Sequence, residues 1–150
     1  MCHTMHLDLQ HITEIDIFRD LSSDEVESIL PMIHPVKIFE GERLIREGDT
    51  SQIFYIVLSG NYLVYFKDGR AFTLNRKGDI IGWTTIANPF TYQESAVALT
   101  DGEALTIPVE EFLDLIQSNS KLSNKLTQKV MEIIRHRKAF IRNSIPDNPS

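Results

Sequence analysis

The chain has 150 residues, of which 42% are hydrophobic and 24% are charged, and it contains 7 glycines and 6 prolines. This length and composition predict one compact domain and exclude collagen-like, low-complexity and wholly disordered chains. The single cysteine, Cys2, excludes an internal disulfide and a zinc site built from several cysteines. Because the N-terminus lacks a secretion signal and no apolar run could span a membrane, we expect a cytoplasmic protein without membrane contact.

The formal net charge of −6 is unevenly distributed along the chain. Residues 1–120 carry eight basic and nineteen acidic side chains, whereas residues 121–150 carry seven basic and two acidic ones. A basic segment of this kind can bind the phosphates of nucleic acid or of a membrane surface. The interpretation we favour needs no such partner: a positively charged helix lies along its own acidic domain.

The first predicted helix begins at Ser22, after a segment of apolar and acidic residues over 12–20. Ser22 and Glu25 have the spacing of a capping box, in which each side chain binds the backbone N–H of the other residue. Pro31 and Pro35 mark the end of this helix. The apolar residues that it is expected to bury are Val26, Ile29 and Leu30.

From residue 36 to residue 107 the pattern changes to short runs of β-branched and aromatic residues. Turn signals such as Gly48-Asp49 and Asp68-Gly69 separate these runs. Short strands at this spacing predict an antiparallel jelly roll or barrel rather than alternating strands and helices. The predicted strands are 36–39, 43–46, 53–58, 62–66, 71–74, 96–99 and 104–107.

Two helices are predicted to close the domain, one beginning at Pro108 and a longer one over about residues 121–142. Residues 143–150 are expected to be a flexible tail. The longer helix carries an apolar stripe that must be covered, either by its own domain or by the same helix of a second copy in a homodimer. The candidate dimer-interface residues are Leu122, Leu126, Val130, Ile133 and Phe140.

This order of elements resembles the cyclic nucleotide-binding domain, the sensor domain of cyclic-AMP receptor regulators, kinase regulatory subunits and nucleotide-gated channels. The residues that carry the resemblance are Phe39-Glu40-Gly41-Glu42, Gly48-Asp49, Phe54-Tyr55-Ile56-Val57, Gly60 and Gly78-Asp79-Ile80-Ile81-Gly82. The resemblance implies a mainly β fold: an antiparallel β-roll over about 36–107, with an N-terminal helix and two C-terminal helices. It covers 15–142 as the domain and leaves 1–14 as an N-terminal extension.

The resemblance also implies a phosphate-binding cassette, in which a Gly-Glu pair opens a short helix and an Arg followed by a small residue binds the cyclic phosphate. Gly82 matches the glycine, but Trp83 replaces the glutamate that binds the ribose. Aligned on Ser95 as the small residue, Glu94 replaces the arginine. A carboxylate there would repel the phosphate, so cyclic nucleotide affinity is expected to be strongly reduced.

The candidate ligand-binding residues are Gly82, Trp83, Thr84, Thr85, Gln93, Glu94 and Ser95, together with Arg137 on the last helix, which the resemblance places near the base. We expect a non-catalytic regulatory module that binds a small ligand, which a cyclic nucleotide or another molecule could be, and signals through its last helix. The alternative is a module without a ligand that binds itself or a partner protein. If Trp83 and Tyr92 pack as core residues, no room remains for a ligand; if they line an open pocket, the sensor is favoured.

Other classes of function find little support in the sequence. Cys2, His3, His6 and His11 lack a second group of ligands, so we predict no metal or cofactor. No serine or cysteine stands in a nucleophile motif, which argues against an enzyme. The chain ends about where the DNA-binding domain of the receptor regulators would begin, so direct DNA binding is not expected.

Overall fold

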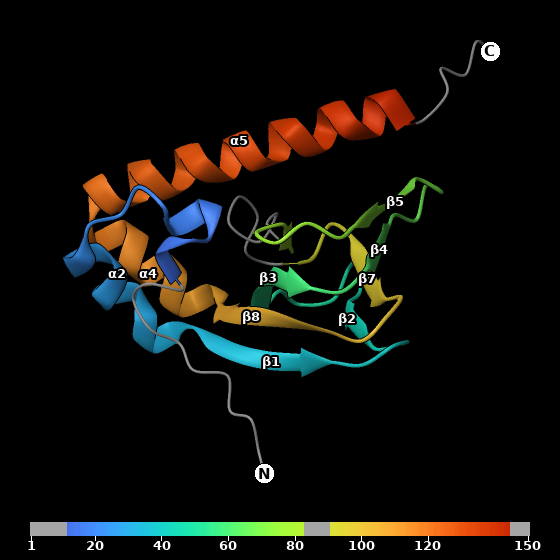
Figure 1. Cartoon of the computed structure of the whole chain (residues 1–150), viewed down its shortest axis with the longest axis horizontal. Coiled ribbons are helices and arrows are strands. Elements are labelled where there is room, and N and C mark those ends of the chain that lie inside the picture. Colours follow the sequence, from blue (N-terminus) through green and yellow to red (C-terminus); the bar gives the residue numbers. More distant parts are fainter. Residues whose placement is uncertain (1–11, 83–90, 145–150) are drawn as a thin grey trace.

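The fold has a helical end and a β end, joined by one long helix (Figure 1). The computed structural model of the chain describes residues 12–82 and 91–144, with side chains in the last helix described up to Ile133 and again at Arg135. The helices are η1 (Asp16–Phe18), α2 (Ser23–Ile29), η2 (Leu30–Met32), α4 (Val109–Ser118) and α5 (Ser120–Ser144). The strands are β1 (His34–Ile38), β2 (Arg43–Ile45), β3 (Ile53–Ser59), β4 (Tyr62–Tyr65), β5 (Ala71–Leu74), β6 (Ile80–Ile81), β7 (Ser95–Ala98) and β8 (Gly102–Pro108).

The strands form two four-stranded antiparallel sheets, in the orders β1-β8-β3-β6 and β2-β7-β4-β5. This arrangement confirms the predicted β-roll with flanking helices. The seven predicted runs all correspond to strands, with ends that differ by at most two residues. The strand that we did not predict is β6, because two residues are too short to show an alternating pattern.

The capping box at the start of α2 is present as predicted. Ser22 Oγ accepts the N–H of Glu25 at 3.2 Å, and Glu25 Oε1 accepts the N–H of Ser22 at 2.9 Å. The helix buries Val26 and Ile29. Ile12 is only 1% exposed, so packed structure includes residues that precede position 15, where we expected the domain to begin.

Two apolar clusters make up the core. The first joins the helices to one face of the sheet β1-β8-β3-β6, and the second fills the space between the two sheets. Phe54 of β3 and Phe112 of α4 belong to the first cluster and meet edge to face, with ring centroids 5.1 Å apart. This contact fixes the closing helices to the roll.

The apolar stripe of α5 packs on the chain's own core. Leu122, Leu126 and Val130 are buried in the first cluster, and Ile133 packs against it. The dimer interface expected for the first three is therefore corrected, since residues buried in their own domain have no surface to offer a second copy. The apolar residues of the stripe have the same helical spacing whether they pack on their own domain or on a second copy. The sequence alone therefore could not tell which of the two covers them. The side chain of Phe140 lies outside the described residues.

The basic side of α5 lies along acidic residues of the N-terminal segment. Lys125 Nζ is 2.6 Å from Glu25 Oε1, and Lys129 Nζ is 3.1 Å from Asp20 Oδ2. Lys129 also lies 3.4 Å from Glu132 within the helix. These ion pairs match the favoured interpretation of the charge asymmetry. The hydrogen bond from Lys125 is the main reason that the pKa of Glu25 lies below its ordinary value of 4.5, and Asp20 raises the pKa of Lys129.

Across residues 12–82 and 91–144, no helix combines the length and apolar character that crossing a membrane requires.

The packing of α5 predicts that Leu126→Ala lowers the free energy of unfolding by about 2–5 kcal/mol, because a fully buried leucine leaves a cavity. The loss should not depend on protein concentration, as urea denaturation at several concentrations would measure. Met131→Ala is the control on the same helix, because Met131 is 49% exposed and its loss should cost at most about 0.5 kcal/mol. A small loss at Leu126 with a concentration-dependent melting temperature would instead indicate a subunit interface.

The ion pair between Lys125 and Glu25 predicts a change in acid stability. A carboxyl whose pKa is lowered by folding stabilises the fold above its ordinary pKa of 4.5, and this contribution is lost as the pH falls through the lowered value. In Lys125→Met the pKa of Glu25 should move back toward 4.5, and the loss of stability on acidification should become shallower. NMR titration of Glu25 and urea denaturation across the acid range measure both effects. Lys121→Met, a change at an exposed lysine of the same helix, should keep the original profile.

Candidate ligand-binding site

The predicted cassette begins at Gly82, directly after β6. Gly82 has φ +85°, a conformation that side chains rarely adopt, and a Cβ here would stand 3.5 Å from the ring of Tyr92. The glycine that the resemblance singled out is therefore required by the backbone itself. Trp83, Thr84 and Thr85, which we expected to follow it in the site, lie outside the described residues.

Glu94 faces the cassette glycine from inside the protein. It is 1% exposed, and its Oε1 accepts the N–H of Gly82 at 3.2 Å. The structure thus brings together two of the predicted site residues, but in an arrangement that the sequence did not suggest. The carboxylate of Glu94 accepts the backbone N–H at the start of the predicted cassette. It therefore occupies the donor that the phosphate of a ligand would need.

Gln93 and Ser95 flank Glu94 in the sequence, but their side chains contact other parts of the protein. Gln93 is exposed, and its amide donates to the carbonyl and hydroxyl oxygens of Thr91 at 3.3 and 3.2 Å. The Oγ of Ser95 accepts the N–H of Glu47 at 2.8 Å, so this hydroxyl holds the loop after β2. The described structure does not bring either side chain together with Gly82.

Tyr92 packs as an interior residue. It is 6% exposed, and its hydroxyl donates to the carbonyl of Ile53 at 2.7 Å. The same oxygen accepts the N–H groups of Gln52 and Ile53 at 3.3 and 3.2 Å. For Tyr92, the structure answers the question that the sequence left open: this side chain fills the roll and ties the cassette's far end to β3.

Two further tyrosines fill the same interior. Tyr55 donates to the carbonyl of Leu44 at 3.3 Å, and burial raises the pKa of Tyr55 to about 12. Tyr62 donates to the carbonyl of Ser59 at 2.7 Å, and burial raises its pKa as well. Both hydroxyls therefore stay neutral, and both are engaged with backbone. The space between the sheets is occupied by side chains whose polar ends already have partners.

Arg137 belongs to α5, but its side chain lies outside the described part of that helix, so its predicted contact with a base has no structural test.

A metal site would need a group of at least three histidine, cysteine, aspartate or glutamate side chains. Among the described residues there is no such group. His3, His6 and His11 precede those residues.

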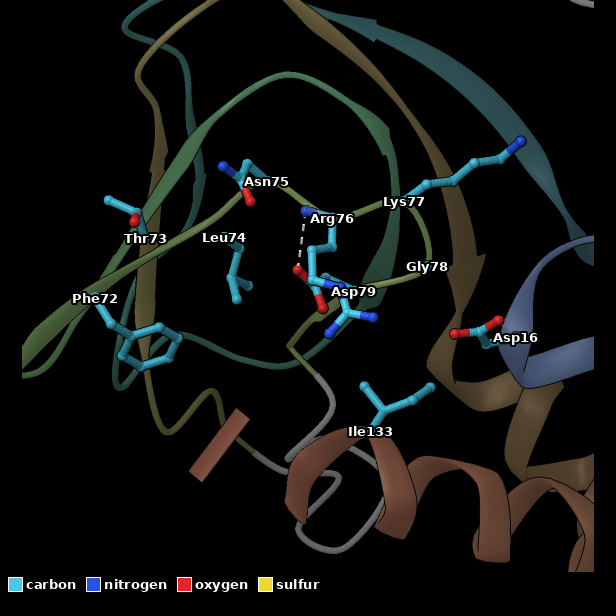
Figure 2. A pocket seen from close by; sticks show the side chains of 10 residues that line it. All are labelled: Asp16, Phe72, Thr73, Leu74, Asn75, Arg76, Lys77, Gly78, Asp79 and Ile133. Carbon is cyan, nitrogen blue, oxygen red and sulfur yellow. Dashed lines mark hydrogen bonds between the residues drawn. The ribbon is translucent and has the colours of Figure 1, made fainter. Parts of the chain in front are cut away.

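The structure shows a pocket that the sequence analysis missed (Figure 2). It has a volume of about 170 Å³ and lies between β5, the turn at residues 75–79, η1 and α5. We interpreted Gly78-Asp79 as a turn between strands and did not consider what the turn faces. The one signal in the sequence was the adjacent pair Arg76-Lys77, but a pair of basic residues in a turn is ordinarily a solvated surface.

Comparisons with known proteins agree with this architecture. A cyclic nucleotide-binding domain from Methylobacillus flagellatus superposes with a TM-score of 0.76 at 20% identity, over 95% of this chain and 83% of that one. The sensor domain of the transcriptional regulator DNR from Pseudomonas aeruginosa superposes with a TM-score of 0.69 at 19% identity, over 86% and 94%. At these identities the likeness establishes the fold.

Sequence relatives carry the domain within longer proteins. The cAMP-dependent protein kinase type II regulatory subunit of Drosophila melanogaster is 22% identical over 132 residues, which are 88% of this chain and 35% of that protein. An NTE family protein of Mycobacterium bovis is 21% identical over 124 residues, which are 83% of this chain and 21% of that protein. The chain thus spans about a third or less of the length of these relatives.

Two antiparallel four-stranded sheets, with helices before and after them, make up the architecture to which these comparisons refer. The family model for the cyclic nucleotide-binding domain matches residues 35–119, which is more than half of the chain. This chain belongs to the cyclic nucleotide-binding domain family, whose domains are regulatory, non-catalytic modules.

The contact between Glu94 and Gly82 predicts that Glu94→Ala lowers the free energy of unfolding by about 1–3 kcal/mol, because the buried N–H of Gly82 loses its acceptor. Glu94→Gln keeps an amide oxygen at the same position and should lose less. Urea denaturation at neutral pH measures both, with the exposed Gln93→Ala as the control. Equal stability of Glu94→Ala and the original chain would show that the hydrogen bond contributes nothing to folding.

Proposed function

We propose that this chain is a non-catalytic sensor module that binds a small ligand beside its β-roll and signals through α5. The observation that carries the proposal is the course of α5. α5 runs from the helical end of the fold toward the roll (Figure 1). Its first half is anchored in the helical cluster through Leu122 and Leu126, while Ile133 further along lines the pocket at the edge of the roll. One helix therefore connects the pocket at the edge of the roll with the helical cluster.

A cyclic nucleotide is the ligand suggested by the family, and this chain's cassette supports at most weak binding. The carboxylate of Glu94 stands in place of a guanidinium and already accepts the N–H of Gly82. A cyclic phosphate would have to displace this carboxylate and would gain no cation from position 94. We therefore infer that any cyclic nucleotide binds at millimolar rather than micromolar concentration, or that the ligand is a different small molecule.

The second candidate function is a module that keeps the fold without a ligand and binds a partner protein. The specific observation in its favour is the interior of the roll. Tyr55, Tyr62 and Tyr92 fill it, and their hydroxyls bind backbone groups. The two functions differ in whether any small molecule stabilises the folded chain, because only a ligand that binds the native state raises its melting temperature.

Titration with cyclic AMP and cyclic GMP tests the proposal, with the emission of Trp83, the only tryptophan, as a reporter of the cassette. We expect no saturable change below millimolar nucleotide. A true site filled to a hundred times its dissociation constant would add about 2.7 kcal/mol of stability and raise the melting temperature by several degrees. Such a response at micromolar nucleotide would overturn our interpretation of Glu94.

Hydrogen exchange of α5 tests the signalling part. We expect that a small molecule that raises the melting temperature also changes amide exchange in the second half of α5, after Val130. A stabilising ligand that leaves α5 unchanged would contradict signalling through this helix. A flat response to a broad set of small molecules, with a partner protein that protects the surface, would favour the second candidate function.

A further inference from the structure

The pocket at the edge of the roll combines a hydrogen-bonded turn with three apolar side chains (Figure 2). The turn at residues 75–79 is tied to β3, because Gly78 donates to the carbonyl of Val57 and Val57 donates to the carbonyl of Asp79, both at 2.8 Å. Leu74, Phe72 and Ile133 supply the apolar surface. The pocket is therefore built from β5, the turn and α5, and its described lining includes none of the cassette residues Gly82, Gln93, Glu94 or Ser95.

Arg76, an exposed residue of the turn, brings a positive charge to this pocket. Figure 2 shows its side chain reaching between Leu74 and Ile133, whereas the side chain of Lys77 extends away from them. Within the described residues, the ion pairs of the structure include neither Arg76 nor Lys77. A guanidinium presents parallel N–H donors that match the oxygens of a carboxylate or a phosphate.

The two carboxylates of the lining are engaged elsewhere. Asp16 Oδ1 lies 2.6 Å from the guanidinium of Arg19, and Asp79 Oδ2 accepts the backbone N–H of Arg76 at 3.2 Å. Asp79 thus closes the turn, and Asp16 has a cation of its own. The guanidinium of Arg76 is the polar group of the pocket that best fits an external anion.

The size of the pocket limits its ligand. A volume of about 170 Å³ is below the roughly 300–1,000 Å³ of sites for drug-sized molecules and close to the about 150 Å³ of a cavity that holds benzene. One ring or a short branched chain fits against Leu74 and Ile133, with a charged group at Arg76. This space is too small to enclose a whole nucleotide.

We propose that this pocket binds a small organic anion, a carboxylate or a phosphate ester on an apolar body of about one ring, and that Arg76 binds its charged group. The site is separate from the cassette, so it stands whether or not cyclic nucleotides bind. Ile133 couples it to α5: it lines the pocket and packs against the helical cluster at the same time. Filling the pocket changes the packing of Ile133 and with it the position of α5.

The test is an NMR titration of the ¹⁵N-labelled chain with benzoate, with benzamide as the uncharged control of the same shape. We expect saturable shifts at the amides of residues 72–79 and 133 with benzoate and much weaker ones with benzamide. Phenyl phosphate in a parallel titration tells which anion is preferred, a phosphate ester or a carboxylate. Cyclic AMP should leave these amides unshifted at the same concentrations, which separates this site from the cassette.

Matched variants identify the binding residue. Arg76→Gln should weaken benzoate binding about tenfold or more, because it removes a charge-assisted pair of hydrogen bonds. Lys77→Gln removes the same charge from the neighbouring position and should change the affinity by no more than about twofold. Equal effects of the two variants, equal binding of benzoate and benzamide, or no saturable shift at residues 72–79 would each overturn the proposal.

Discussion

The two-sided sheet β1-β8-β3-β6 is the constraint on which the rest of the structure depends. Along β3, Phe54 and Ile56 enter the cluster with the helices, whereas Tyr55 and Val57 enter the interior of the roll. Successive residues of a strand point to opposite faces of the sheet. A strand that is apolar on both faces therefore contributes to two cores, which is possible only if both faces of the sheet are covered. The helices are therefore required by the sheet, and their position follows from it. A shift of register by one residue would exchange the two sets of side chains and would place tyrosine hydroxyls among the helices.

The sequence predicted those parts of the fold that depend on local chemistry. Ser22 and Glu25 predicted a helix start because both partners of the capping box lie within four residues. The strands were predictable because each predicted run of β-branched and aromatic residues lies between turn signals. The neighbour of the α5 stripe was not predictable, because Leu122 and Leu126 have the same spacing whether they meet their own domain or a second copy. Strand β6 was too short to show a period. The pocket joins residues of β5 to Ile133, which are far apart in the chain, and nothing in either segment indicates the other.

The candidate site was predictable in its residues and not in its arrangement. Comparison of the cassette pattern with the chain identified Gly82 and Glu94 as the informative positions. It could not reveal that they bind each other, because the distance between Glu94 Oε1 and the N–H of Gly82 depends on how β6 and β7 are placed. The structure therefore gives the glutamate at position 94 a role of its own. Glu94 is a buried partner for the backbone N–H of Gly82, a contact that the sequence did not suggest.

In the sensor that we propose, the ion pairs at Lys125 and Lys129 would make α5 act as a lever. They hold the first part of the helix to α2 and the segment before it, which puts a pivot near Val130. With a rise of 1.5 Å per residue, Ile133 lies about 4.5 Å beyond this pivot and Ser144 about 21 Å beyond it. A tilt that shifts Ile133 by a few tenths of an ångström displaces the end of the helix more than four times as far. If the chain signals as we propose, a displacement too small to disturb the core next to Ile133 would be large enough at the end of α5 to change the surface that a neighbouring molecule meets.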